Sequence, residues 1–147
     1  MSYATDIADA VKTEINAAPA GTFSVPFIAV RKVHPEYELT ALKNLTVTVV
    51  PRSVLITTAG RSMCYRDIAI DIGIQQKLEN PSAFDERVNA LGTVVDEIAD
   101  YMRQRTLSTA TYAVWVSITN DPVYAPEHLA EQHLFTSVLT LTYRMMT

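Results

Sequence analysis

The sequence predicts a single α+β domain spanning residues 1–147, with a mostly antiparallel sheet of about five to six strands packed against one long and one shorter helix. Isoleucines occupy every second position within residues 64–75, with polar side chains between them, which is typical of a strand buried on one face. Apolar residues recur every three or four positions over residues 84–105, which indicates a long amphipathic helix. A chain of 147 residues can bury a sufficient core without a disulfide or a metal.

The strand over residues 64–75 is the predicted centre of the sheet. Its buried wall consists of Ile68, Ile70, Ile72 and Ile74. Asp67 and Asp71 alternate with these isoleucines, so they point to the outer face, where we expect them to be solvated or ion-paired. Gly73 indicates either a bulge or a place where another backbone approaches closely. Cys64 is the only cysteine, so no intrachain disulfide can form, and we expect a packed thiol.

Before the central strand, the sequence predicts a helix and an edge strand. The helix covers residues 5–18, with Thr5 as its cap and apolar residues along one face. A strand over residues 23–30 contains Pro26, which cannot donate a hydrogen bond to a neighbouring strand. This strand therefore lies at an edge of the sheet or carries a bulge.

A polar loop over residues 31–39 leads to two further strands. The first covers residues 45–50 and ends at Pro51, and the second covers residues 54–58. The glycine-containing connection at residues 59–62 predicts a hairpin. We therefore expect the second of these strands to run antiparallel to the central strand.

After the central strand, the sequence predicts the long helix and the last two strands. The helix follows a cap at either Asn80 or Ser82 and extends to about Arg105, with acids in its first turn and bases in its last turn. Its apolar stripe consists of Phe84, Val88, Leu91, Val95, Ile98 and Met102. A strand over residues 114–118, a turn or short helix over residues 126–131 and a strand over residues 134–145 complete the chain.

Charge is unevenly distributed along the chain, whose formal net charge is −4. Residues 31–66 contain six bases and two acids, a net charge of +4, and the remainder contains six bases and fourteen acids, a net charge of −8. This asymmetry is either chance clustering or a pair of complementary surfaces on neighbouring copies, since opposed potentials fix the register of an interface. The negative total argues against nucleic-acid binding by the whole surface.

Residues typical of catalysis or ligand binding form no recognisable motif. His128 and His133 are five positions apart and do not share a helical face as a zinc-binding pair does. The four glycines form no phosphate-binding loop. We therefore expect no catalytic residues, no cofactor and no metal, and we expect that the protein is not an enzyme. The N-terminus lacks the features of a signal peptide, and no apolar run is long enough to span a membrane.

The order of elements, a helix, strands with a mid-chain hairpin, a long helix and two closing strands, carries a family resemblance. It rests on residues 45–51, 60–62, 65–75, 91–100, 121–126 and 135–143. This pattern is similar to that of the small α/β proteins known as tail terminators, or tail-completion proteins, of long-tailed bacteriophages. The resemblance covers most of the chain.

What the resemblance implies is a structural role in a virion. Such proteins form a ring, commonly of six copies, that caps the finished tail tube and presents a surface to the head connector. The implied partners are other copies of this chain, the tail tube protein and the connector or neck protein. DNA would pass through the lumen without sequence-specific binding. The protein would be made in the host cytoplasm and reside at the head–tail interface of the virion.

Four bases of the 31–66 segment are candidate interface residues, namely Arg31, Lys32, Arg52 and Arg61. We expect them on loops that face a neighbouring copy, the tube end or the lumen. Three alternatives remain open. The protein could be another phage neck or connector protein, a small-molecule enzyme or binding domain with a deep polar pocket, or a nucleic-acid or regulatory module that uses the basic segment.

Overall fold

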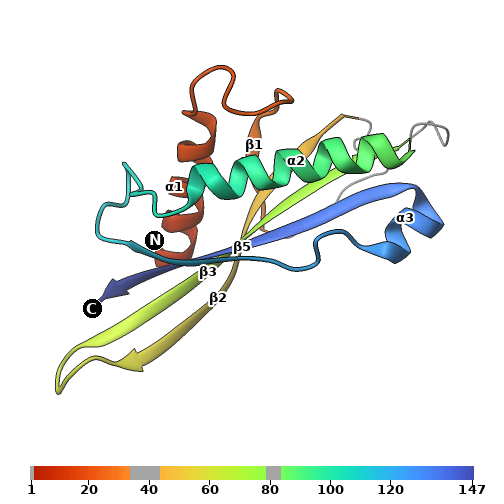
Figure 1. Ribbon diagram of the computed structural model, residues 1–147. Helices are drawn as coiled ribbons and strands as arrows, with labels where there is room; N and C mark the ends of the chain where they lie inside the picture. The colour runs from red at the N-terminus through yellow and green to blue at the C-terminus, as the bar shows by residue number, and fades with distance from the viewer. Residues whose placement is uncertain (1, 34–43, 79–83) are drawn as a thin grey trace.

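A computed structural model describes residues 2–33, 44–78 and 84–147, in which five strands form one sheet in the order β1-β2-β3-β5-β4. The elements are α1 (Tyr3–Asn16), β1 (Ala29–Arg31), β2 (Thr46–Thr58), β3 (Cys64–Lys77), α2 (Phe84–Met102), β4 (Val114–Asn120), α3 (Pro126–Gln132) and β5 (Leu134–Met146). α1 and α2 cover one face of the sheet (Figure 1). Neighbouring strands are antiparallel except for β1 and β2. The predicted α+β class and mostly antiparallel sheet are confirmed.

β3 occupies the predicted central position, because it pairs with β2 on one side and with β5 on the other. All four of its alternating isoleucines are fully buried. The β5 residues beside them continue the buried wall, with Ile68 paired to Tyr143, Ile70 to Leu141 and Ile72 to Leu139. The predicted hairpin between β2 and β3 is confirmed by their antiparallel register.

Gly73 lies in a regular part of β3, so the expected alternative of a bulge at this position is wrong. It pairs with Thr48 on β2 and with Val138 on β5 without a change of register. A Cβ atom at this position would lie 3.1 Å from the Thr48 hydroxyl oxygen, which is a tight contact. The glycine therefore leaves room for the side chain of Thr48, which is itself buried.

The first of the two longer helices differs from its predicted bounds at both ends, since α1 ends at Asn16 and not at residue 18, and α2 differs at its C-terminal end. α1 begins at Tyr3, after an N-cap at Ser2, so Thr5 is not its cap. α2 ends at Met102, three residues before the predicted end, because Gln104 adopts a left-handed backbone conformation with φ of 54°. The predicted cap at Asn80 or Ser82 and most of the predicted loop over residues 31–39 lie outside the described residues.

The predicted strand over residues 23–30 is wrong for most of its length. Only Ala29–Arg31 forms a strand, although its predicted edge position is confirmed. The side chain of Asn16 accepts a hydrogen bond from the Ala29 N–H at 2.8 Å and donates one to the Ala29 carbonyl at 3.0 Å. The rings of Phe23 and Phe27 stack 5.0 Å apart against the core. Side-chain contacts therefore hold this segment in place of a strand ladder.

The two strands predicted over residues 45–50 and 54–58 are one continuous strand, β2. Pro51 does not end it, because the register shifts between Pro51 and Ser53 and leaves Arg52 as a bulge. A second bulge, between Trp115 and Ser117, breaks the alternation predicted for β4. In both strands the bulge changes which face the following side chains occupy.

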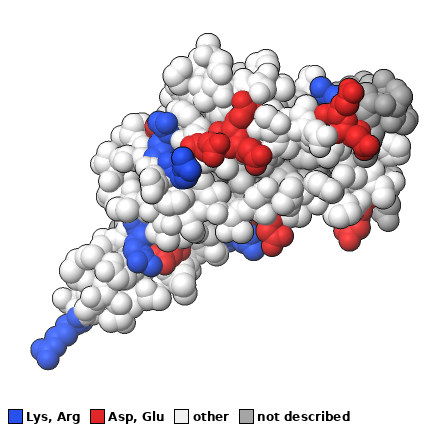
Figure 2. All heavy atoms as spheres, viewed as in Figure 1, with Lys and Arg blue, Asp and Glu red and all other residues white. Residues whose placement is uncertain are grey.

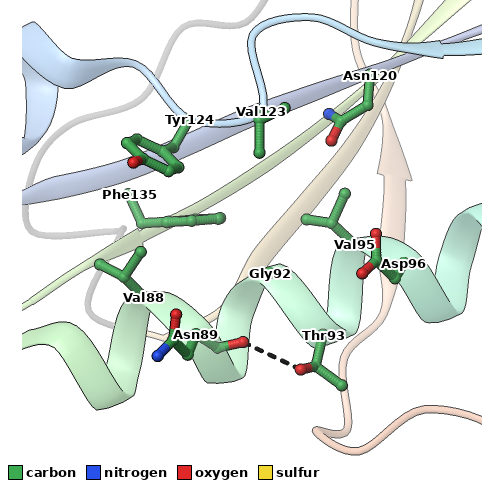
Figure 3. A pocket seen from close by; sticks show the side chains of 10 residues that line it. All are labelled: Val88, Asn89, Gly92, Thr93, Val95, Asp96, Asn120, Val123, Tyr124 and Phe135. Atoms are coloured by element: carbon green, nitrogen blue, oxygen red, sulfur yellow. Dashed lines mark hydrogen bonds between the residues drawn. The ribbon is translucent and has the colours of Figure 1, made fainter.

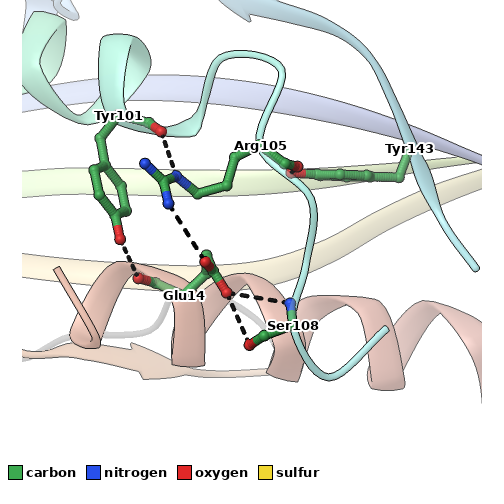
Figure 4. A network of polar contacts seen from close by, with 5 residues as sticks. All are labelled: Glu14, Tyr101, Arg105, Ser108 and Tyr143. Atoms are coloured by element: carbon green, nitrogen blue, oxygen red, sulfur yellow. Dashed lines mark hydrogen bonds and ion pairs between the residues drawn. The ribbon is translucent and has the colours of Figure 1, made fainter. Parts of the chain in front are cut away.

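A buried polar network ties α1 to the end of α2 and to the following link (Figure 4). The Glu14 carboxylate accepts hydrogen bonds from the N–H and hydroxyl of Ser108, at 3.3 and 3.1 Å, and pairs with Arg105 at 3.6 Å. The Tyr101 hydroxyl donates to the Glu14 carbonyl, and the Tyr143 hydroxyl donates to the Arg105 carbonyl. Burial raises the pKa of Tyr143, so its phenol stays protonated as a donor. The network thus serves to fix the helices over the sheet.

The isoleucine wall predicts a large difference between two otherwise identical substitutions. Ile72→Ala, which removes a fully buried side chain, should lower the free energy of unfolding by about 2–5 kcal/mol. The matched Ile56→Ala, at a position 52% exposed, should lower it by less than about 1 kcal/mol. Urea unfolding followed by circular dichroism measures both. Equal losses would mean that Ile56 belongs to the same core.

The polar network predicts a second stability effect. Glu14→Ala should lower the free energy of unfolding by about 0.5–1.5 kcal/mol, because the Ser108 N–H and the Arg105 side chain lose their acceptor in a partly buried site. The control Asp100→Ala, at an exposed carboxylate on α2, should change it by less than about 0.5 kcal/mol. Urea unfolding measures the free energy for both variants. No loss of stability in Glu14→Ala would show that the network does not stabilise the fold.

Candidate assembly interface

The β2–β3 hairpin extends beyond the body of the protein as an arm, formed by residues 52–66 (Figure 1). Every residue from 52 to 58 is exposed. Three consecutive members are large and apolar, Val54, Leu55 and Ile56, with exposed fractions of 42%, 60% and 52%. Successive residues of a strand point to opposite faces, so the arm exposes apolar side chains on both of its faces. A contiguous exposed apolar surface of this kind marks a contact site.

The arm is basic, and α2 is acidic. The arm contains three arginines and no acid, whereas α2 contains five acids and one base. Figure 2 shows a base at the tip of the arm and acids gathered along α2. The charge asymmetry predicted from the sequence therefore corresponds to separate surfaces on one molecule, which is the arrangement that two copies in head-to-tail contact would use.

The first two predicted interface residues lie at the edge of the sheet beside α1. Arg31, at the end of β1, forms an ion pair with Asp9 of α1, so its charge is partly neutralised within the protein. Lys32 is exposed, and its backbone N–H donates to the Val49 carbonyl at 3.0 Å. Arg31 is therefore the last residue of a strand and not part of the predicted loop, whereas Lys32 lies in the connection that follows the strand, as predicted.

The other two predicted residues belong to the arm, at opposite ends of it. Arg52 is the bulged residue of β2, and its guanidinium lies 3.5 Å from the Asp71 carboxylate and 3.3 Å from the Thr140 hydroxyl. Arg61 lies in the turn at the tip and is exposed, with no partner among the described side chains. The four residues thus form no single cluster.

The sheet face opposite α1 and α2, called the open face below, carries ion-paired carboxylates. Arg144 donates from Nε and Nη2 to the two carboxylate oxygens of Asp67, at 2.7 and 3.0 Å. These hydrogen bonds lower the pKa of Asp67, and the nearby positive charge adds to the shift while burial opposes it. Asp71 pairs with Arg52 and also accepts a hydrogen bond from Thr140 at 2.7 Å. The expectation of ion-paired outer-face carboxylates is confirmed.

The described surface has several cavities, and one of about 250 Å³ lies between α3 and the sheet, where it is lined by Asp71 and His128 among others. Another, of about 370 Å³, lies between α2 and the connection from β4 to α3. Figure 3 shows Phe135 at its centre, with Val123 and Tyr124 on one side. Its Thr93 hydroxyl donates to the carbonyl of its own helix, and its Asn120 amide donates to Ser137 and Val138. Polar groups therefore do not converge on this second cavity as they do in an active site.

Residues 2–33, 44–78 and 84–147 meet the requirements neither of a metal-ligand cluster nor of a membrane-spanning helix. No three His, Cys, Asp or Glu side chains of these ranges lie close enough together to hold a metal ion. Cys64, at the start of β3, is half-buried and has a free thiol. None of the helices formed by these residues has the length and apolarity needed to cross a membrane.

β4 forms the second exposed apolar surface, at the far edge of the sheet from β1. Val114 and Val116 are 65% and 40% exposed. Sequence reasoning predicted strands over residues 54–58 and 114–118 but did not identify either as an exposed apolar surface. The available signal was the absence of charge, since residues 53–60 and 106–120 contain no charged side chain.

Comparisons with known proteins establish the fold. No protein-family model matches the chain, and no curated protein matches its sequence. Among solved structures, the fold resembles that of a chain from the virion of a native gene transfer agent particle, with a TM-score of 0.65 and 12% sequence identity. The likeness covers 99% of this chain and 100% of that chain. At this identity, it shows that the two chains share a fold over their whole lengths.

The Asp67–Arg144 pair predicts a pH dependence of stability. A carboxylate whose pKa is lowered by folding stabilises the protein above its unfolded value, near 3.8, and this contribution is lost as the pH falls through the folded value. Asp67→Asn should therefore be less stable than the wild type at pH 7, by up to about 1 kcal/mol, and the difference should shrink as the pH falls below the unfolded value of 3.8. Urea unfolding at pH 7 and at a series of lower pH values measures it, and a pH-independent difference would contradict the ion-pair origin.

Proposed function

We propose that this protein is a structural virion component that forms a ring on the end of a tail tube and joins the tail to the head connector, the role of a tail terminator. The observation that carries the proposal is the shared fold, since the match to a chain of a virion particle extends over 99% of this chain and all of that one. The resemblance of the sequence pattern to tail-completion proteins points to the same role.

The surface features support assembly into a ring. Subunits of a ring meet through two different surfaces, one on each side of the subunit. This chain has a basic, apolar arm and, elsewhere on the molecule, an acidic helix and an exposed apolar edge strand. Because these surfaces differ, each copy can bind the next one through the same contact, and the contact repeats in one direction around the ring. Six copies is the expected number, by resemblance.

We also propose that the protein is not an enzyme. The cavity between α2 and the β4–α3 connection has its Thr93 hydroxyl and Asn120 amide engaged within the protein. The outer-face carboxylates Asp67 and Asp71 each face a guanidinium, and the His128 ring hydrogen-bonds to the Thr136 hydroxyl. Partners are then proteins, namely the tube protein and the connector, while DNA passes through the lumen. Another neck or connector role is the alternative that shares these features.

The decisive experiment is imaging of the purified protein with and without tail tubes. Light scattering gives the mass in solution, and negative-stain microscopy of the same fraction shows whether rings form and where they bind. Closed rings, or a monomer that closes into rings on tube ends, support the proposal. A strict monomer that ignores tubes overturns it, and salt-dependent DNA binding by that monomer would favour the nucleic-acid alternative.

A charge reversal at the arm tip tests the role of the basic segment. Arg61→Glu should reduce the fraction of capped tubes about tenfold, which corresponds to about 1.4 kcal/mol of lost interaction, because a like charge then faces the acidic surface of a neighbour. Arg103→Glu, at an exposed position after α2, is the control with the same change of net charge and should cap normally. Counting capped ends in micrographs compares the two. Normal capping by Arg61→Glu would remove the arm tip from the interface.

A further inference from the structure

The sheet has two edges that the described strands leave open. β1 covers β2 only at the pairs from Ala29 with Val47 to Arg31 with Val49. Beyond them, residues 52–58 pair with β3 alone, and β4 pairs with β5 alone. Each of these stretches is seven residues long. An open edge presents unpaired N–H and C=O groups, which are a template for another strand.

Apart from Arg52 at the start of the β2 edge, neither edge has the charged residues with which proteins usually protect such strands. Residues 53–60 and 113–120 contain no Lys, Arg, Asp or Glu. Both edges instead expose large apolar side chains, among them Leu55 and Val114. A single bulge interrupts each edge. Edges of this composition associate with other strands unless a partner covers them.

The strand register places the two open edges in one row of the sheet. Leu55 pairs with Asp67, Asp67 pairs with Arg144, and Arg144 pairs with Val114. Directly paired residues point to the same face of a sheet, so all four side chains lie on the open face. Leu55 and Val114 are the exposed ends of this row.

The strand directions suit a head-to-tail contact. β2 runs antiparallel to β3, β3 to β5, and β5 to β4, so β2 and β4 run in opposite directions. A second copy rotated about an axis along the strands therefore presents its β2 antiparallel to the β4 of the first. Antiparallel pairing is the more stable arrangement per residue.

We infer that copies of this chain join by pairing the open edge of β2, residues 52–58, with β4 of the next copy, so that one sheet continues from subunit to subunit. The contact joins two different surfaces, and its repetition closes into a ring. The inference rests on the proposed function, because it specifies how the ring is held together. The same contact covers the exposed Leu55 and Val114 and satisfies the backbone groups of both edges.

Cysteine cross-linking tests the pairing directly. In a Cys64→Ser background, the double variant Leu55→Cys/Val114→Cys is treated with a short bismaleimide and separated on a denaturing gel. A ladder of covalent multimers is expected, because each copy offers one thiol to each neighbour. The pair Leu55→Cys/Ser117→Cys, also on the open face, detects the same contact if the strands of the two copies are shifted along one another. Leu55→Cys/Thr93→Cys, with its second thiol on the exposed side of α2, is the matched control and should stay monomeric.

The single variants separate the inferred contact from its rivals. Leu55→Cys or Val114→Cys alone should give no cross-linked product. A dimer from either single variant would show that like edges meet, which overturns the inference. Monomers from both test pairs, under conditions where the wild type forms rings, also overturn it and leave the proposed function standing. A wild type that never assembles, on tubes or in solution, overturns both.

A charge on the edge gives an independent test. Val114→Lys adds a residue type that protects natural edge strands, at a side chain 65% exposed. The variant should keep the circular dichroism spectrum of the wild type and lose its oligomers in light scattering. Val123→Lys, at a side chain 59% exposed on the β4–α3 connection, should still assemble. Assembly of a folded Val114→Lys at the wild-type level overturns the inference.

Discussion

The fold depends on keeping the isoleucines of β3 out of water. Each fully buried side chain of this size contributes about 1.5–3 kcal/mol, and β3 can bury them only if two helices lie across the same face of the sheet. α1 packs over β2 and β3, and α2 packs over β5. The Glu14 network then holds the helices in position through Ser108 and Arg105. α3 covers part of the open face, where His128 hydrogen-bonds to Thr136, and the arm and β4 remain exposed at the edges of the sheet.

Periodicity predicted the elements whose burial is regular. The alternating residues of β3 and β5 are buried as their spacing indicates, and so are four members of the predicted α2 stripe, Leu91, Val95, Ile98 and Met102. Element ends and breaks were less predictable, because they depend on single residues. Pro51 was taken as the end of a strand, yet a bulge at Arg52 lets β2 continue. Residues 23–30 alternate like a strand, yet the Asn16 amide and stacked phenylalanine rings hold most of them in an irregular path.

The candidate interface was predictable in its charge and not in its shape. Counting bases and acids separated a basic segment from an acidic remainder. The apolar run at Val54, Leu55 and Ile56 predicted a strand, but hydrophobicity alone does not show whether another element of the fold packs against it. Only the three-dimensional arrangement shows that the helices end before the arm begins (Figure 1). For the same reason, the four candidate bases could be named but their separation along β1 and the arm could not.

The perimeter of the sheet is a better contact surface than its open face. Asp67 and Asp71 already have guanidinium partners, and a partner that covered them would have to remove water from ion pairs without improving their geometry. The edges of the sheet differ from the face, because they expose apolar side chains beside unpaired backbone groups. Another strand would cover the side chains and hydrogen-bond to the backbone groups, and the row from Leu55 to Val114 identifies the residues that it would meet. The carboxylates of the open face already have partners, whereas the backbone groups of the edges do not. The sheet is therefore suited to association with other copies through its edges.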